Sequence, residues 1–417
     1  MTLFKLSSVE IQIKPLIIAF VVFISCEASA SNYWDFISES IKDSPSSVLL
    51  SRVEASSDSL IGIEKANRSP IITGGLSRVD GASSLSETSD AYQASIDLSY
   101  TLYDNGIQDF KDIKAHSQAA LEIANAAVDY EEDLVDASAA YIDYWAASRS
   151  IVLLNSALVK VANLRSKIEI ALSEGEATVN QLYKLEEYEL NLKASLLDAE
   201  SKKSSSEIFW QSINPKEHQW VLPDPNEVLS YTLSDNLNVH SLRSQLSIVN
   251  ANKGALESEG GLQLGLSVSA LQRYYSSGDN GTNLLWSLNA TYPLFDGGRL
   301  EAKVYREALT ASTIEQQLKV ALENQLRAQR RLSQYISSKV QLVSSKADLC
   351  DKQQEMLNNT QERYDIGRGN VEQLLESALS ASNCQNSLIS ERADLYHALN
   401  EYSKTVGYLV SKYVDLR

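Results

Sequence analysis

The side chains of this chain that could carry out chemistry are few and widely spaced. The four histidines are His116, His218, His240 and His397, and their spacing matches no metal site. No glycine-rich phosphate loop, nucleophile elbow or histidine–carboxylate motif is present in the sequence. The many Asp and Glu residues follow helical spacing, which is typical of solvated helix faces. The sequence therefore predicts a protein that is not an enzyme and that holds no cofactor or metal.

The one covalent reaction that the spacing predicts is a disulfide between Cys350 and Cys384. Cys350 lies 17 residues before Gly367, and Cys384 lies 17 residues after it. In a helical hairpin that turns at Gly367, the two cysteines lie at the same height on adjacent helices. An oxidising compartment joins such a pair. Two buried thiols that face different neighbours are the alternative.

Residues 1–30 have the pattern of a secretory signal peptide. Two lysines flank its start, residues 16–24 are apolar, and residues 28–30 form a small-x-small cleavage pattern. We expect cleavage after Ala30. Acylation of Cys26 in a lipoprotein is the alternative, although residues 23–25 match a lipobox poorly. No later segment approaches the ~18 to 20 continuous apolar residues of a spanning helix, so the chain either stays outside the membrane or crosses it as strands.

The charge and the composition narrow the class of partner and of fold. The net charge of −17 argues against nucleic acid and against docking on anionic lipid. Seven prolines and 17 glycines in 417 residues indicate long, uninterrupted elements.

The chain contains one unit twice, with an offset of 192 residues. Residues 100–106 (YTLYDNG) return as residues 292–298 (YPLFDGG), and Gly175 with Gln181 returns as Gly367 with Gln373. We therefore expect two repeats, at 31–224 and 225–417. In the first repeat we place the strands at about 70–103 and the helices at about 105–208. In the second, the strands fall at about 262–295 and the helices at about 299–410.

Each repeat reads as a helix, a strand hairpin, a very long helix and a return helix. The leading helices are expected at 33–67 and 226–258, and the long helices end at turns on Gly175 and Gly367. At 1.5 Å per residue, ~70 residues form a rod of about 100 Å. Apolar residues at heptad spacing predict coiled-coil packing along these rods. In the second repeat that row is Ile314, Leu318, Ala321, Ala328, Leu332, Tyr335 and Leu342.

The strands alternate apolar and polar residues. Even-numbered residues 92–102 are apolar, whereas odd-numbered residues 93–101 are Gln, Ser, Asp, Ser and Thr. Such strands have one face in lipid and one in water, or they form an ordinary amphipathic hairpin on a soluble core. Aromatic residues expected at the strand ends favour membrane interfaces. They are Tyr92, Tyr100, Trp286 and Tyr292.

Four strands are too few to form a barrel with an interior, since about eight is the smallest number that does so. Open strand edges are not tolerated in hydrocarbon. If the hairpins lie in a membrane, several chains must share one barrel, and the helices would continue it as a water-filled duct.

With these residues in view, the chain resembles the TolC family of outer-membrane efflux and secretion channels. One motif is residues 292–298, where a strand bends into a helix. Another runs from Tyr364 to Gly367 and is followed by residues 371–376 at the far turn. The first-repeat versions at 100–106 and 175–182 also match, so the resemblance covers essentially the whole chain after the leader. The residues of the strand-to-helix bends are Gly106, Pro293, Gly297 and Gly298.

The resemblance implies a homotrimer, in which three chains form a 12-stranded β-barrel in outer-membrane lipid. A periplasmic α-helical tunnel would continue from the barrel, with a mixed equatorial region built from residues 201–231 and the terminus. The tip turns at Gly175 and Gly367 would meet a periplasmic membrane-fusion (adaptor) protein. That adaptor would couple the channel to an inner-membrane transporter of ABC or RND type.

In the family, hydrogen bonds and a ring of acidic residues constrict the tip. Tyr364 matches a tyrosine of that constriction, and Glu376 matches one acidic ring position. Gln181 and Gln373 stand where better-known members carry aspartate, and Gly369 stands where an arginine would bond. A strong latch would therefore need Arg368 or Glu372 to substitute. We expect three Glu376 side chains to favour cations, with a solvated coiled-coil charge as the alternative.

These observations predict a mainly α-helical protein with paired β-hairpins that acts as a passive exit duct. The duct would serve a tripartite efflux system or type I secretion. A secreted coiled-coil scaffold or adhesin without a pore is the alternative. The sequence leaves open whether small molecules, metal ions or unfolded protein pass through.

Overall fold

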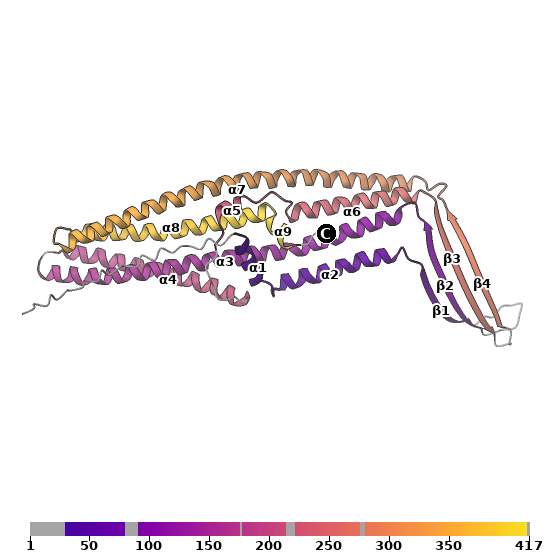
Figure 1. The fold of residues 1–417 in the computed structure, drawn as a ribbon, viewed down its shortest axis with the longest axis horizontal. Coiled ribbons are helices and arrows are strands. Elements are labelled where there is room, and N and C mark those ends of the chain that lie inside the picture. The colour runs from indigo at the N-terminus through magenta and orange to yellow at the C-terminus, as the bar shows by residue number, and fades with distance from the viewer. Residues whose placement is uncertain (1–29, 80–90, 176, 214–221, 276–279, 415–417) are drawn as a thin grey trace, which may run out of the picture.

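The structure, a computed structural model, describes residues 30–79, 91–175, 177–213, 222–275 and 280–414. Residues 1–29 of the expected signal peptide, Cys26 among them, lie outside these ranges. His218 and part of the expected equatorial connection also lie outside them. The molecule is a long rod of helices with a four-stranded sheet at one end (Figure 1). At the other end lie the turns of two helical hairpins. This arrangement fixes two places where function can reside, the sheet and the tip.

The elements follow the same order in the two halves of the chain. The first half contains α1 (Ala30–Ser40), α2 (Pro45–Ala66), β1 (Ile71–Val79), β2 (Ala91–Tyr103), α3 (Ile107–Ser173) and α4 (Val179–Ile213). The second half contains α5 (Pro225–Leu229), α6 (Leu237–Glu259), β3 (Gln263–Tyr275), β4 (Asn280–Thr291), α7 (Arg299–Asp365), α8 (Val371–Thr405) and α9 (Tyr408–Tyr413). Both long helices have 67 residues, and both return helices have 35. Their first residues differ by 192 in number, which is the offset of the sequence motifs.

The prediction of one continuous leading helix in each half is wrong. In the first half the chain breaks between α1 and α2, where the Ser44 side chain accepts a hydrogen bond from the Ser47 amide and Pro45 occupies the first turn. Proline at this position favours a new helix start. In the second half Asn236 caps α6 by accepting from the Val239 amide at 3.1 Å. Both breaks arise from local capping, which apolar periodicity does not detect.

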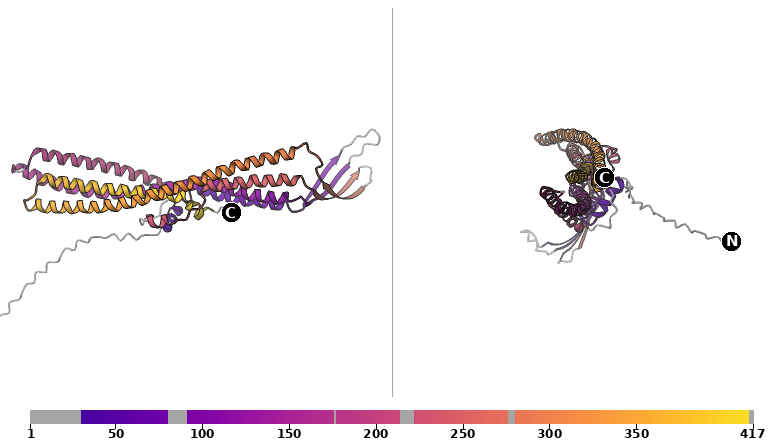
Figure 2. Two further views of the ribbon diagram at one scale, coloured as in Figure 1. Left: turned by 90° about the horizontal axis from the view of Figure 1, so that it is seen from above. Right: turned by 90° about the vertical axis from the view of Figure 1, so that its left-hand side faces the viewer.

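The long helices lie side by side in one curved layer. Next to the sheet their order is α2, α3, α6 and α7, and towards the tip it is α4, α3, α8 and α7 (Figure 1). Seen along the rod, the helices form an open arc (Figure 2). One side of the layer is therefore formed by α2 near the sheet and by α4 near the tip. The other side is formed by α7 along its whole length. No helix in the described part of the chain is long and apolar enough to cross a membrane.

The largest core cluster lies midway along the rod, where both ends of the described chain meet α3. Tyr33 and Trp34 of α1 are fully buried beside Tyr141, and Leu409 of α9 packs on the same cluster. Burial of each such side chain contributes about 1.5 to 3 kcal/mol. Around this core, Asp35 accepts hydrogen bonds from Lys412 and from Tyr413, both at 2.8 Å. The N-terminal and C-terminal segments thus hold the middle of the rod together.

The heptad rows of the sequence divide into a buried and an exposed set. Ala127, Leu134 and Tyr141 are buried, as predicted for a coiled-coil row. On α7, however, the buried row is Ile336, Cys350 and Leu357, with Val343 packed against it. The predicted row members Tyr335 and Leu342 are exposed, because each lies one residue, or about 100° of helix rotation, from the buried row.

The sheet is antiparallel, with the order β1, β2, β3, β4. The two hairpins pair through β2 and β3, and Ser99 lies opposite Ser267. A register irregularity between Thr101 and Tyr103 marks the end of β2 where the chain bends towards α3. Within the described chain, β1 and β4 each have a strand on one side only.

Candidate functional site

The sheet presents two chemically different faces. The strand register places the even-numbered residues of all four strands on one face of the sheet. The centre of this face is apolar and consists of Ile72, Leu76, Ile96, Leu98, Leu266, Val268, Leu284, Trp286 and Leu288. The opposite face is mainly polar, and there the Ser269 hydroxyl donates to Asp97 and the Ser267 and Ser287 hydroxyls lie 2.7 Å apart. No strand residue whose side chain the structure describes is buried, and Leu76 is 89% exposed.

An exposed apolar sheet face is costly in water, because burial is worth about 25 cal/mol per Å² of apolar surface. A strand with one apolar and one polar face is typical of barrels in lipid. One sequence expectation is wrong here, since Trp286 lies opposite Val268 in the middle of the strands and not at their end. Tyr92, by contrast, pairs with Tyr274 near the hairpin turns. An aromatic pair therefore lies at that end of the apolar face.

The two strand-to-helix bends have the same geometry. In the first, the Asp104 carboxylate accepts hydrogen bonds from the Gly106 amide at 3.0 Å and the Gln108 amide at 2.7 Å. In the second, Asp296 accepts from Gly298 at 2.9 Å and from Leu300 at 2.7 Å. These amide hydrogen bonds lower the pKa of Asp296. The sequence motif contained both aspartates, but their capping role follows only from the structure.

The glycines of the bends adopt the conformations that glycine permits. Gly106 and Gly298 have φ of 85° and 84°, and Gly297 has φ of 69°, in the left-handed region that costs other residues roughly 1 to 2 kcal/mol. Asn105 occupies the position of Gly297 with φ of 60°. Pro293 lies in the link between β4 and α7, where it interrupts no ladder hydrogen bond. All four predicted bend residues lie at the junction of sheet and rod.

The tip is formed by the turns α3–α4 and α7–α8. Gly175 and Gly367 have φ of 78° and 71°, and the Gly367 amide donates to the Tyr364 carbonyl at 2.9 Å. At Gly369 an added Cβ would lie 2.6 Å from the Tyr364 backbone nitrogen. This position is therefore limited to glycine by the tightness of the turn, which explains why no larger side chain stands there.

The structure separates the other predicted constriction residues into two groups. Gln181 is engaged in the start of α4, where its side-chain oxygen accepts from the Thr178 amide at 2.9 Å. Tyr364 is half-buried, and the Lys167 ammonium lies 5.5 Å from the centre of its ring. Arg368, Gln373 and Glu376 are exposed. Gln373 and Glu376 lie three residues apart on α8 and so share a face.

Two ion pairs at the tip join the two helical hairpins. Lys184 of α4 pairs with Glu372 of α8, and Lys167 of α3 pairs with Asp365 of α7 at 2.6 Å. The hydrogen bond to Glu372 raises the pKa of Lys184, and that from Lys167 lowers the pKa of Asp365. Sequence reasoning considered Glu372 and missed its partner. No local signal in the sequence identifies this partner, because Lys184 and Glu372 lie 188 residues apart in the chain.

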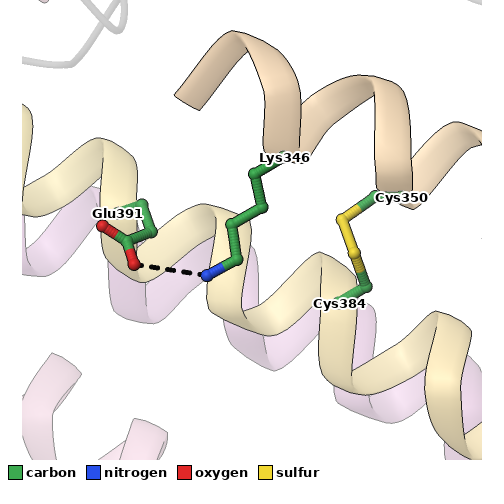
Figure 3. Close-up of a disulfide and its surroundings, with 4 residues drawn as sticks. All are labelled: Lys346, Cys350, Cys384 and Glu391. Atoms are coloured by element: carbon green, nitrogen blue, oxygen red, sulfur yellow. Dashed lines mark hydrogen bonds and ion pairs between the residues drawn. A yellow bond between two sulfur atoms is a disulfide. The ribbon is translucent and has the colours of Figure 1, made fainter. Parts of the chain in front are cut away.

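Farther from the tip, α7 and α8 are joined covalently. Cys350 and Cys384 form a disulfide with their Cα atoms 5.4 Å apart (Figure 3). Lys346 donates to Glu391 at 3.2 Å, and Lys339 donates to the same carboxylate at 2.6 Å. These bonds lower the pKa of Glu391. The second hairpin is therefore held by a covalent bond and, about two helical turns farther along α8, by charged side chains.

Among the residues that the structure describes, no group of three or more His, Cys, Asp or Glu side chains could hold a metal ion. His397 lies 3.0 Å from Asp143, and this pair joins α8 to α3. What the geometry provides is two surfaces, a two-faced sheet and a charged tip, at opposite ends of a rod.

The fold matches that of solved outer-membrane channels. The outer membrane protein VceC of Vibrio cholerae superposes with a TM-score of 0.71 at 14% identity, over 90% of this chain and 96% of that one. A membrane protein of Pseudomonas aeruginosa gives 0.71 at 18% identity, with 91% and 94% covered. The open state of the MtrE outer membrane channel of Neisseria gonorrhoeae gives 0.71 at 15%, with 90% and 88% covered. No protein-family model and no curated protein sequence matches the chain. The fold is TolC-like, as the motifs predicted.

Proposed function

We propose that this protein is an outer-membrane channel, the passive exit duct of a tripartite efflux or type I secretion system. The observation that carries the proposal is the sheet, which exposes an apolar face across four strands and a mainly polar face behind it. Lipid satisfies the first face and water the second. The solved structures of the same fold, described as outer membrane channels, support this function.

The open edges of the chain support assembly of several copies. β1 and β4 need partners, because an unpaired edge in hydrocarbon leaves backbone groups unsatisfied. Pairing β4 of one chain with β1 of the next satisfies both edges and closes a ring. We propose a homotrimer with a 12-stranded barrel in outer-membrane lipid. The arc of helices (Figure 2) would then close into a periplasmic tunnel.

The tip is the proposed contact with the rest of the system. Gly175 and Gly367 expose two narrow turns at the end farthest from the sheet (Figure 1). We propose that a periplasmic adaptor protein meets these turns and links the channel to an inner-membrane transporter of ABC or RND type. In this proposal the energy of export comes from that transporter, and the channel is a passive duct.

The charged tip is the proposed entrance. Lys184–Glu372 and Lys167–Asp365 hold the two hairpins of one chain together, and separating the hairpins would break both pairs. Exposed Glu376 side chains of three copies would form an acidic ring and favour cations. Arg368, Gln373, Gln181 and Tyr364 complete the proposed entrance, with Gln181 acting through the start of α4.

Planar-bilayer conductance of the detergent-purified protein, measured together with its mass in detergent, tests the proposal. Trimers that conduct cations, with selectivity reduced in Glu376→Gln, are the expected result. Glu362→Gln is the control, because Glu362 is also an exposed carboxylate near the tip but lies on α7. A monomer that stays soluble without detergent and never conducts would instead identify a secreted coiled-coil scaffold.

A further inference from the structure

A cavity of about 200 Å³ lies between the two helical hairpins in the tip half of the rod. Its lining comes from α3 and α4 of the first hairpin and from α7 and α8 of the second. On α7 the lining residues fall between Cys350, which forms the disulfide, and Asp365, which pairs with Lys167. A small molecule in this cavity would therefore touch both hairpins of one chain at once.

The buried part of the cavity wall is mainly apolar. It belongs to the core cluster that the two hairpins share, and its larger aliphatic members are Val161, Leu164, Leu357, Leu374 and Leu375. Ala157, Ala378 and Ala381 also line the cavity, and an alanine leaves space that a leucine at the same position would fill. The buried ring of Tyr188 completes this wall. Aromatic rings pack favourably on one another, so the wall suits an aromatic body.

The exposed part of the wall is polar and has a single charge. Lys160 is the only charged side chain among the lining residues, all of which the structure describes. It is exposed, and its ammonium group makes no ion pair or hydrogen bond within the described part of the chain. Gln354 and Gln385 add uncharged amide groups from α7 and α8. The cavity thus places one free cation beside an apolar wall.

Size and charge together select one class of ligand. One lysine balances one negative charge, and a second charge on the ligand would be left without a partner. An engineered apolar cavity of roughly 150 Å³ holds benzene, so about 200 Å³ holds one ring with small substituents. We propose that the cavity binds a small aromatic monocarboxylate, with its ring on the apolar wall and its carboxylate on Lys160. The site goes beyond the proposed channel, because binding requires only the folded chain.

Isothermal titration of the purified protein with para-methylbenzoate tests the site. One molecule per chain should bind, and para-methylbenzylamine, which has a similar ring and the opposite charge, should not displace it. Lys160→Gln should weaken binding roughly ten-fold, because it removes a hydrogen bond between two charged groups. Lys160→Arg keeps the charge and should retain most of the affinity. Lys111→Gln is the matched control, since Lys111 is an exposed lysine of α3 outside the cavity.

A second variant and a second measurement locate the ligand. Ala378→Leu fills the cavity without changing its charge, and it should abolish binding. Hydrogen exchange with para-methylbenzoate bound should slow at 153–164 in α3 and at 374–385 in α8, because both segments line the cavity. Lys160 is exposed, so Lys160→Gln is expected to fold even if the core variant does not.

Several results would overturn the proposal. They are the absence of saturable binding, unchanged affinity in Lys160→Gln, displacement by para-methylbenzylamine, binding that persists in folded Ala378→Leu, and slower exchange in one hairpin only. A protein that conducts but does not bind para-methylbenzoate would overturn the site and leave the channel standing. A protein that binds it through Lys160 but does not conduct would support the site and count against the channel.

Discussion

Reducing the Cys350–Cys384 disulfide should loosen the tip half of the α7–α8 hairpin and leave the rest of the rod unchanged. The bond links residues 34 apart, so it restricts a loop of that length whenever the hairpin opens. The chain-entropy relation gives about 4 kcal/mol for such a loop, and measured disulfides typically contribute about 2 to 4 kcal/mol. Since 1.4 kcal/mol is a factor of ten, local opening should become roughly 30-fold to 700-fold more frequent.

Hydrogen exchange followed by mass spectrometry measures this opening without requiring reversible unfolding of the protein. Wild-type protein is compared oxidised and reduced, so that both sulfur atoms stay in place and packing is unchanged. Faster exchange is expected between Cys350 and Cys384. It should stop short of Glu391, because Lys346 (Figure 3) still holds that carboxylate in the reduced protein. Lys339 holds it as well.

The first hairpin is the internal control. At the offset of 192, the positions equivalent to the two cysteines are Leu158 and Leu192. Leu192 is buried in the apolar cluster that α3 and α4 share with α7 and α8, and Leu158 packs against this cluster. Exchange in α3–α4 should not change on reduction. Equal acceleration in the two hairpins would refute the reasoning, because it would mean that reduction loosens the whole rod. No acceleration between the cysteines would refute it as well.

Three further predictions concern substitutions elsewhere in the rod and at the tip. Leu158→Cys/Leu192→Cys should form a second intrachain disulfide, detected by mass mapping, because the repeat places the two leucines as it places the cysteines. Gly369→Ala should destabilise the α7–α8 turn by about 1 to 3 kcal/mol through overpacking, and proteolysis confined to the tip is the measurement. Burial raises the pKa of Glu131 from about 4.5 to about 7, while Lys404 opposes the rise. Its contribution to stability is complete below pH 4.5 and is lost as the pH rises through 7, by about 3 kcal/mol. Glu131→Gln should therefore reduce the fall in melting temperature between pH 5 and pH 8, and an unchanged fall would contradict this account.

Much of the rod could be predicted from residue types at fixed spacing. The glycines at the bends and at the tip turns mark the ends of α3 and α7, because positive φ ends a helix most readily at glycine. The offset of 192 between the repeats predicts that the two helices have the same length. The breaks before α2 and α6 were missed, since Ser44 and Asn236 act through local capping hydrogen bonds. The capping role of Asp104 and Asp296 was missed for the same reason, although both aspartates stood inside the quoted motif.

The tip contains side-chain contacts that the sequence did not predict. Gln181 was assigned to a constriction by resemblance, and in the structure its side chain caps α4. The pair Lys184–Glu372 joins residues 188 apart in the chain, and no local pattern predicts which lysine meets which carboxylate. Tyr335 and Leu342 were assigned to a coiled-coil row, and both are exposed in the structure of the chain. A single sequence gives the period of a heptad, but it does not say which of two neighbouring rows faces inward.

The sequence by itself determined the periodicities: two repeats, rods of helix, strands with two faces, and two cysteines equidistant from a turn. These follow from local geometry, because a residue's face depends on its position within a period of 3.6 or 2. Only the tertiary structure decided which elements are neighbours, which apolar row is buried and which charges meet. Those outcomes depend on how four helices and four strands pack beside one another, and packing brings together residues whose separation in the chain carries no signal.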